Sequence, residues 1–471
     1  METALDTGTT AWMLISASLV LLMTPALSLF YGGMVRTKSV LNMMMMSFGA
    51  LGVVGVIYVL WGYSMSYGST DILGVFASPF DHFALHGLLA DAGGEWVINS
   101  LGYPEAVNVA FQATFAIITV ALISGAIADR ARFGTWLVFS ALWVTLAYFP
   151  LAHMVWGGGL LSADGPIAKI ATPIDFAGGT VVHINAGMAG LVLALIVGTR
   201  VGFGKVAMRP HNLPLVMLGA GLLWFGWFGF NAGSALAADG NAGLAWINTL
   251  VATSAGILGW LVTERIRSGH ATSLGAASGI VAGLVAVTPA AGSISPLGAI
   301  LLGLVAGGLC AVAVEWKFRL GYDDSLDVVG VHLVAGLWGT IAIGFLATGS
   351  GLFYGHGGAQ LLAQVLAAAI ALAFTAVITT VIGLALKYTM GWRISEEDER
   401  LGIDQIAHAE SAYDISGTSG LIVGASDPSM IPVAPTPAGH PTLATTTAIS
   451  TAANSTAADT PADPTREESR A

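Results

Sequence analysis

The sequence predicts an all-α protein that crosses a membrane many times. Of its 471 residues, 55% are hydrophobic and only 10% are charged, whereas a soluble domain carries about 25% charged residues. So few charges cannot cover a surface that faces water, and the composition therefore excludes a soluble enzyme. The apolar residues also form long uninterrupted blocks instead of alternating with period two, which argues against a transmembrane β-barrel. The only cysteine, Cys310, lies in such a block, so neither disulfides nor a cysteine-rich metal site are expected.

Eleven apolar segments are candidates for spanning helices. A helix rises about 1.5 Å per residue and needs about 20 residues to cross about 30 Å of hydrocarbon. None of the segments contains Lys, Arg, Asp or Glu. The eighth is short, and we expect it to extend at both ends. In chain order the segments are 11–31, 40–63, 107–128, 135–155, 176–197, 213–230, 244–262, 274–287, 297–314, 328–348 and 358–386.

The basic residues between these segments predict the topology. Only Lys169 follows an even-numbered segment. Because Lys and Arg favour cytoplasmic loops, we expect the N-terminus outside, the C-terminus in the cytoplasm and the protein in the inner (cytoplasmic) membrane. The first segment lacks a preceding basic region and is interpreted as a retained helix. The basic residues that follow odd-numbered segments are Arg36, Lys38, Arg130, Arg132, Arg200, Lys205, Arg209, Arg265, Arg267, Lys317, Arg319, Lys387, Arg393 and Arg400.

An internal repeat links the fifth and tenth segments. Residues 183–190 (HINAGMAG) and 332–339 (HLVAGLWG) both match H-x-x-A-G-x-x-G. A weaker match joins LFYGG at 29–33 with FGFNAG at 228–233. These matches predict two five-helix halves, and an odd number of helices inserts the second half in the opposite orientation. Acidic residues precede both histidines: Asp175 lies directly before the fifth segment, and Asp323, Asp324 and Asp327 lie before the tenth.

The chain therefore divides into three predicted regions. A membrane domain covers 1–390, with halves at about 11–197 and 213–348 followed by the eleventh helix. Residues 391–414 are charged and partly helical in pattern, so we expect an ordered cytoplasmic contact segment. Residues 415–471 are rich in Ala, Thr, Ser and Pro and lack aromatic residues, which predicts a disordered tail.

His183 and His332 are candidate pore residues. A single histidine inside a span could equally serve an interhelical hydrogen bond. Two at equivalent positions of an inverted repeat would face each other at depth, where polar residues are unfavourable and usually mark a pathway. A metal site would need a third or fourth ligand, and no other His, Cys or carboxylate lies at matching depth.

Aromatic residues gather at the predicted outer ends of three helices. An interfacial aromatic belt is one interpretation, but the small residues around Trp156 and Ser234 favour packed protein over lipid contact. Aromatic faces and one hydroxyl would bind a small cation that donates hydrogen bonds. The members of this group are Phe111, Phe115, Trp156, Trp227, Phe230 and Ser234.

The residues around the histidines favour a small solute that can lose a proton. Asp175 opens the histidine helix, where it would act as an N-cap and add negative field toward the outside. A bare cation would cross a core without carboxylates only at a cost of many kcal/mol. Releasing the proton first avoids much of that cost. Potassium cannot do so, and the sequence holds no T-V-G-Y-G filter.

Five motifs resemble the ammonium transporter family (Amt/Mep/Rh), and its bacterial Amt branch in particular, over residues 10–414. The resemblance implies an eleven-helix transporter without enzymatic activity or cofactor, a homotrimer with one pore per protomer, and ammonium or ammonia as the transported species. The motifs are FQATFA at 111–116, HMVWGGG at 153–159, DFAGGTVVHINAG at 175–187, WFGFNAGS at 227–234 and DDSLDVVGVH at 323–332.

By motif position, the resemblance assigns roles near the outside. It implies that Phe115, Trp156 and Ser234 form the outer ammonium site. It also implies that Phe111 and Phe230 form a stacked gate below that site.

Deeper in the pore, the resemblance implies that Trp227 lines the path and that His183 and His332 are the twin-histidine pair. Asp175 would be the structural acid needed for conduction. The segment 391–414 resembles a cytoplasmic region that takes part in regulation by a PII-type protein in many bacterial members. The stretches 63–104 and 157–174 and the tail have no firm counterpart in the family.

Three functional hypotheses follow. The leading one is an electrogenic ammonium transporter that deprotonates ammonium and conducts ammonia past the histidines. A second is an ammonium sensor that signals through 391–414, and a third is an Rh-like channel for neutral gas. An intact histidine pair favours conduction, and an outer Trp and Ser argue against the neutral channel. The lack of a base and an orienting partner at the level of Ser234 argues against an intramembrane hydrolase.

Overall fold

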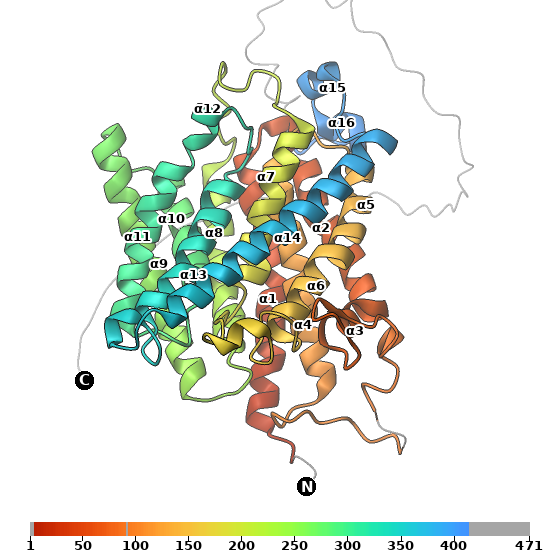
Figure 1. The fold of residues 1–471 in the computed structure, drawn as a ribbon. Coiled ribbons are helices and arrows are strands. Elements are labelled where there is room, and N and C mark those ends of the chain that lie inside the picture. Colours follow the sequence, from red (N-terminus) through yellow and green to blue (C-terminus); the bar gives the residue numbers. More distant parts are fainter. Residues whose placement is uncertain (1–3, 91–92, 414–471) are drawn as a thin grey trace, which may run out of the picture. The chain divides into compact units, whose positions relative to one another are not determined.

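The computed structural model describes residues 4–90 and 93–413, which form a bundle of long helices (Figure 1). Within this part of the chain, ten helices are long and apolar enough to cross a membrane, and one further apolar helix, α10, is shorter. The predicted multi-span α-helical architecture is thus confirmed, and every predicted segment coincides with a helix. The predicted tail 415–471 lies outside the described residues.

The elements have the following bounds. The helices matching the predicted segments are α1 (Thr7–Met34), α2 (Val40–Ile57) with η2 (Tyr58–Gly62) and α3 (Tyr63–Tyr67), α4 (Glu105–Ile123), α5 (Phe133–Trp143) with η5 (Val144–Tyr148) and α6 (Phe149–Trp156), η7 (Gly179–Ile184) with α7 (Asn185–Val197), α8 (Leu213–Gly233), α9 (Gly240–Ser268), α10 (Ser273–Val287), α11 (Pro296–Ala313), η8 (Val329–Leu333) with α13 (Val334–Leu346), and α14 (Ala359–Thr389). The shorter elements are η1 (Thr37–Ser39), β1 (Asp71–Ile72), β2 (Phe76–Ala77), η3 (Phe83–Leu85), η4 (Ser124–Ile127), η6 (Pro166–Lys169), α12 (Trp316–Leu320), η9 (Leu352–Tyr354), α15 (Glu396–Leu401) and α16 (Ile403–His408).

Helix α10 does not extend at both ends, so that expectation was wrong. It has 15 residues, or about 22 Å of rise. Thr272 caps its start by accepting a hydrogen bond from the Gly275 N–H at 2.9 Å. Pro289 follows its end and has no N–H to continue the helix. The buried carbonyls of Ala291 and Ile294 beyond it accept hydrogen bonds from the Asn248 amide, both at 2.8 Å, which satisfies irregular backbone inside the bundle.

Helices α1 and α8, which begin the two predicted halves, pack closely along each other. Glycines on α8 permit this approach. A methyl group at Gly219 would lie 2.4 Å from the backbone N of Phe30, and one at Gly229 would lie 2.9 Å from the Ser16 carbonyl oxygen. Small residues at such contacts let membrane helices approach backbone to backbone.

The described part of the stretch between α3 and α4 contains the β1–β2 hairpin and the short helix η3. The hairpin is held to α6 by buried His153, whose Nε2 lies 2.9 Å from the Asp71 carboxylate. This hydrogen bond lowers the pKa of Asp71 below its usual value. The His153 Nδ1 lies 3.2 Å from the Ser66 carbonyl oxygen. His153 therefore joins α6 to the hairpin through Asp71 and to α3 through Ser66.

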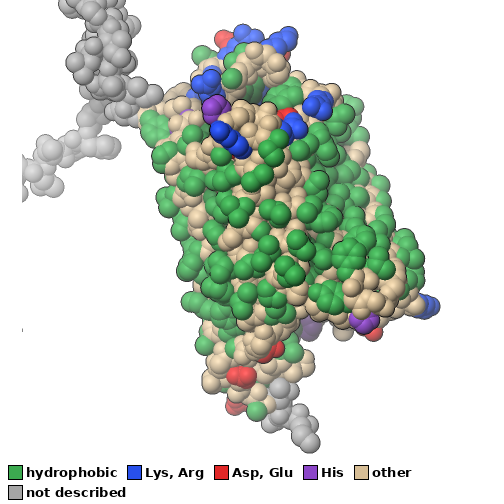
Figure 2. All heavy atoms as spheres, turned by 90° about the vertical axis from the view of Figure 1, so that its left-hand side faces the viewer, with side chains coloured by type: hydrophobic (Ala, Val, Ile, Leu, Met, Phe, Trp, Pro, Cys, Tyr) green, Lys and Arg blue, Asp and Glu red, His purple; other side chains and the backbone are tan. Residues whose placement is uncertain are grey.

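Lys and Arg side chains gather at the end of the bundle that carries α15 and α16, and a broad apolar band lies next to it (Figures 1 and 2). We call this the basic end. Here α16 packs on α2. The Asp404 carboxylate accepts hydrogen bonds from the N–H groups of Leu41 at 3.0 Å and Asn42 at 2.8 Å. Residues 391–413 are therefore part of the helical bundle's surface rather than a free strand of chain.

Candidate functional site

The structure brings the two predicted histidines together in the middle of the bundle. The Nδ1 atoms of His183 and His332 are 3.3 Å apart. Their rings are nearly parallel, with centroids 5.4 Å apart and 16° between the planes. Both side chains are buried, and the His183 Nε2 has no hydrogen-bond partner among the described residues.

Each histidine lies in a π-helical turn: His183 in η7 and His332 in η8. Each turn is capped by the aspartate that lies eight residues before its histidine. Asp175 accepts from the N–H groups of Gly178 and Thr180, both at 2.9 Å. Asp324 accepts from those of Val328 at 3.1 Å and Val329 at 2.7 Å. These bonds satisfy backbone donors that a helix start leaves unpaired. Asp324 is thus the counterpart of Asp175 in the second half of the repeat.

The sequence offered three acids before the second histidine, and the structure separates their roles. The Asp323 carboxylate pairs with Arg200 at 2.8 Å, and the Asp327 carboxylate pairs with Lys317 at 2.6 Å. Asp324 alone points into the turn. Burial raises the pKa of Asp324 above its usual value, and the charge of Lys317 opposes that shift.

Four of the six residues in the predicted aromatic group line a cavity of about 590 Å³, which we call the vestibule. Phe111, Phe115, Trp156 and Ser234 are among its lining residues. Phe115 meets Trp156 edge to face, with centroids 6.3 Å apart and planes at 89°. The Ser234 hydroxyl donates to the Phe230 carbonyl oxygen at 2.8 Å, so its oxygen remains able to accept a hydrogen bond.

The stacked pair differs from the prediction. Phe115, not Phe111, stacks on Phe230, with centroids 4.1 Å apart and 26° between the planes. Phe111 instead packs edge-on against Phe115 at 4.8 Å. Residues four apart share one face of α4, and the rotation of α4 against α8 decides which of the two rings meets Phe230. Phe115 therefore belongs both to the vestibule wall and to the stack that closes it.

Two small cavities continue inward from this stack. The first, of about 10 Å³, is lined by Phe230, Trp227, His183 and His332, and its volume is about that needed for one water molecule. Trp227 packs parallel to His183 with centroids 5.5 Å apart. A second cavity of about 10 Å³ lies beyond His332 and includes Asp327 in its lining. The vestibule, the stack and the histidines thus follow one another along a narrow path.

The stretches 63–104 and 157–174, which have no firm counterpart in the family, also contribute to the vestibule. Asn99, Leu101 and Tyr103 line it from the segment before α4. Ser162 and Asp164 line it from the segment after α6. Both stretches therefore form walls of the candidate site.

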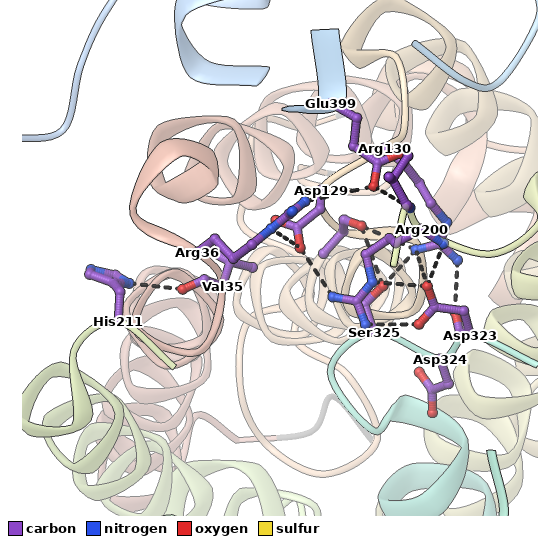
Figure 3. Close-up of polar contacts among 12 residues, drawn as sticks. Val35, Arg36, Asp129, Arg130, Arg200, His211, Asp323, Asp324, Ser325 and Glu399 are labelled. Atoms are coloured by element: carbon purple, nitrogen blue, oxygen red, sulfur yellow. Dashed lines mark hydrogen bonds and ion pairs between the residues drawn. The ribbon is translucent and has the colours of Figure 1, made fainter. Parts of the chain in front are cut away.

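A buried charge cluster at the basic end was missed by the sequence reasoning (Figure 3). Asp129 lies 3.3 Å from Arg36 and 3.1 Å from Arg200, measured between ion-pair atoms, and Arg36 lies 3.7 Å from Glu399 on α15. Arg130 is fully buried, and burial lowers its pKa to about 10. The arginines had been read only as topology signals. The acids close to them in sequence, such as Asp129 beside Arg130, were the signal that could have revealed the cluster.

Within residues 4–90 and 93–413, no three His, Cys, Asp or Glu side chains gather as a metal site.

Comparisons with known proteins all identify the same family. The family model described as the Ammonium Transporter Family matches residues 11–413. An ammonium transporter of Mycobacterium tuberculosis (strain ATCC 25618 / H37Rv) is 53% identical over 442 residues, covering 89% of this chain and 92% of that protein. An ammonium transporter of Aquifex aeolicus is 48% identical, covering 88% and 95%.

Solved structures agree with these sequence matches. Mep2 of Saccharomyces cerevisiae is 32% identical with a TM-score of 0.75, covering 84% of this chain and 91% of that one. A protein described as a sensor Amt protein is 28% identical with a TM-score of 0.77, covering 86% and 98%. The family model and the high identity over most of both chains lead to one conclusion: this chain belongs to the ammonium transporter family.

Proposed function

We propose that this protein transports ammonium across a membrane, taking ammonium at the vestibule and passing ammonia along the two histidines. The observation that carries this mechanism is the buried His183–His332 pair. It lines a cavity the size of one small molecule behind an aromatic stack.

Recruitment takes place in the vestibule. Glu105, Asp164 and Asp175 are among its lining residues, and its described lining includes no Lys or Arg, so its field favours cations. Aromatic faces attract a nearby cation by about 0.5–2 kcal/mol. Phe115 and Trp156 supply such faces, and the Ser234 oxygen accepts one N–H of the ion.

Deprotonation, in which water in the open vestibule takes the proton and leaves ammonia, precedes entry into the narrow path. An unpaired ion loses far more solvation free energy in apolar surroundings than a neutral molecule does, and no carboxylate lines the cavity at the histidines. The stacked rings of Phe115 and Phe230 must part for the molecule to pass. Ammonia is similar in size to water and fits the cavity behind them.

The histidine pair can handle ammonia as both donor and acceptor. A hydrogen bond between two Nδ1 atoms needs one protonated and one bare nitrogen. In two neutral imidazoles, the Nε2 of one ring is then bare and that of the other carries a proton. One can accept an N–H of ammonia and the other can donate to its lone pair. We propose that the proton crosses separately, so that net charge moves with each ammonia.

The test is the current across a supported membrane carrying purified protein after an ammonium pulse. Wild type should give a saturable current. The double variant His183→Ala, His332→Ala should lose that current or lose its discrimination against potassium. A wild type without current that still shifts vesicle pH would replace the electrogenic mechanism with neutral ammonia conduction. Silence in both assays with intact ammonium binding would favour a sensor.

We also propose an inner-membrane homotrimer with the basic end in the cytoplasm, where 391–413 could meet a PII-type protein. The Lys and Arg residues at this end support that orientation. Cys310 is buried and is the only cysteine, so new cysteines can be read without background. Ser100→Cys should react with an impermeant maleimide on intact cells, and Glu397→Cys should react only after lysis. The reverse pattern would invert the topology.

A further inference from the structure

The fully buried amide of Gln364 lies in the long apolar helix α14. Its Oε1 accepts from the Ile174 N–H at 2.7 Å and from the Gln360 amide at 3.1 Å. Its Nε2 donates to the carbonyl oxygens of Ile174 at 2.8 Å and Thr340 at 3.0 Å. An amide side chain has two N–H donors and one oxygen with two lone pairs, so every one of its hydrogen-bonding positions is used.

This bonding pattern fixes the orientation of the amide between its three partner residues. Ile174 offers one N–H and one carbonyl, and only one orientation of the Gln364 amide can satisfy both. The third partner, Thr340, lies on α13, which continues directly from the turn that holds His332. Gln360 adds a further bond, from its amide to the Thr172 carbonyl oxygen at 3.0 Å. Helix α14 therefore holds one segment from each half of the repeat.

The segment that Gln364 holds is irregular and leads directly into Asp175. Asp175 has two structural roles. Its carboxylate caps η7, which contains His183. Its carbonyl oxygen accepts the indole N–H of Trp156 at 2.9 Å. A shift in the backbone at Ile174 would thus move both the vestibule tryptophan and the start of the histidine turn.

We infer that Gln364 is a positioning residue for ammonium recognition: it fixes the backbone at Ile174, and through Asp175 it sets the place of Trp156 in the vestibule. This inference rests on the proposed transport function for its kinetic consequence. Its structural consequence, an Asp175 cap that depends on α14, can be measured without transport.

The kinetic test is a double-mutant cycle between Gln364→Leu and Trp156→Phe, with initial ammonium currents measured against concentration. Gln364→Leu should raise the half-saturating concentration about three- to tenfold, as expected for a lost hydrogen bond. Phe has no N–H to bond the Asp175 carbonyl, so in the Trp156→Phe background Gln364→Leu should add less than about twofold. Two effects that simply multiply would overturn the inference.

The matched control is Thr379→Val on the same helix. Thr379 is equally buried, and its hydroxyl oxygen accepts the Trp143 indole N–H at 2.9 Å, away from the vestibule. The Thr379→Val variant removes a comparable polar contact of α14, so its half-saturating ammonium concentration should equal that of wild type. A rise as large as that of Gln364→Leu would mean that any loosening of α14 has the same effect, and would overturn the inference.

The structural test is amide hydrogen exchange over residues 171–182. Exchange there should be faster in Gln364→Leu than in wild type, and unchanged in Thr379→Val. Unchanged exchange in Gln364→Leu would overturn the inference even if transport were normal. A wild type that does not transport would defeat the proposed function while leaving this test readable. If Gln364→Leu does not fold, Gln360→Leu removes two bonds of the same group, to Gln364 and to Thr172. It leaves the bonds between Gln364 and Ile174 in place, so it should show the same changes at smaller size.

Discussion

At the scale of single residues, the aromatic stack distinguishes the rings that face the transport path from rings that only pack between helices. Phe230 stacks on Phe115 and lines the histidine cavity. Phe228, two residues earlier on α8, stacks on Trp246 at 4.4 Å instead. Two equally large rings on one helix thus differ in whether they face the path.

Phe230→Ala should therefore change transport more strongly than Phe228→Ala. Removing the Phe230 ring opens the stack and takes away the ring against which Phe115 packs nearly parallel. We expect a two- to tenfold rise in the half-saturating ammonium concentration, within the range of one cation–π or aromatic contact. Currents from both variants at matched expression measure the difference. Equal effects would mean that the stack is only packing.

At the scale of secondary-structure elements, α2 depends on another part of the chain for its first turn. Its own N-cap residue, Ser39, makes no side-chain capping bond. Asp404 on α16 supplies the acceptor for Leu41 and Asn42 instead. Burial raises the pKa of Asp404 above its usual value. Cap and helix are thus more than 350 residues apart in sequence.

Asp404→Asn should lower the thermal stability of the detergent-solubilised protein, because an amide offers one acceptor oxygen where the carboxylate offers two. A lost N-cap is worth about 0.5–2 kcal/mol. Glu397→Gln, an exposed change on α15, is the control and should leave the melting temperature in place. If the two variants melt together, the capping bonds do not contribute to stability.

Much of this element structure could be predicted from the sequence, because eleven charge-free apolar segments must each become a helix in lipid. The histidine pair was also predictable, since the repeat placed both residues at equivalent positions. Three features were not. The length of α10 depends on Pro289 together with Asn248 from another helix. The choice between Phe111 and Phe115 depends on helix rotation. The role of the Gln364 amide depends on its partners Ile174 and Thr340, which lie far away in the sequence.

At the scale of the whole molecule, the buried charge cluster joins the ends of several helices. Asp323, which precedes η8, accepts from the Arg200 guanidinium, and Arg200 also reaches Asp129 after η4. Burial alone would raise the pKa of Asp323, but the hydrogen bonds and charge of Arg200 outweigh it and hold that pKa below its usual value. Asp323 is therefore charged at neutral pH and pairs with Arg200 there.

Asp323→Asn should reduce the free energy of unfolding by about 3 kcal/mol at neutral pH, because Arg200 keeps a buried charge with one partner fewer. The pKa of Asp323 is near 3.8 in the unfolded chain and lower in the folded protein. Its charged form therefore stabilises the fold fully at pH values above 3.8, and this contribution is lost as the pH falls through the folded pKa. Wild type should thus lose more stability than Asp323→Asn on acidification below that point.

Unfolding of the detergent-solubilised proteins at several pH values measures this difference. Glu396→Gln is the matched control, since its pair with Arg400 is exposed at 3.9 Å and should matter by less than about 1 kcal/mol. An Asp323→Asn protein with the stability and pH slope of wild type would show that the cluster does not hold the basic end together.

The mirrored capping of η7 and η8 has a thermodynamic consequence. Each imidazole sits in the same kind of turn, held by an aspartate at the same distance along the chain. Because the two imidazoles are held alike, either could be the donor in the Nδ1–Nδ1 hydrogen bond, and exchange of the two roles would let the pair serve a molecule arriving from either face. The direction of net flow would then be set by concentration and voltage, with the unequal ends of the protein altering only how readily each face is entered.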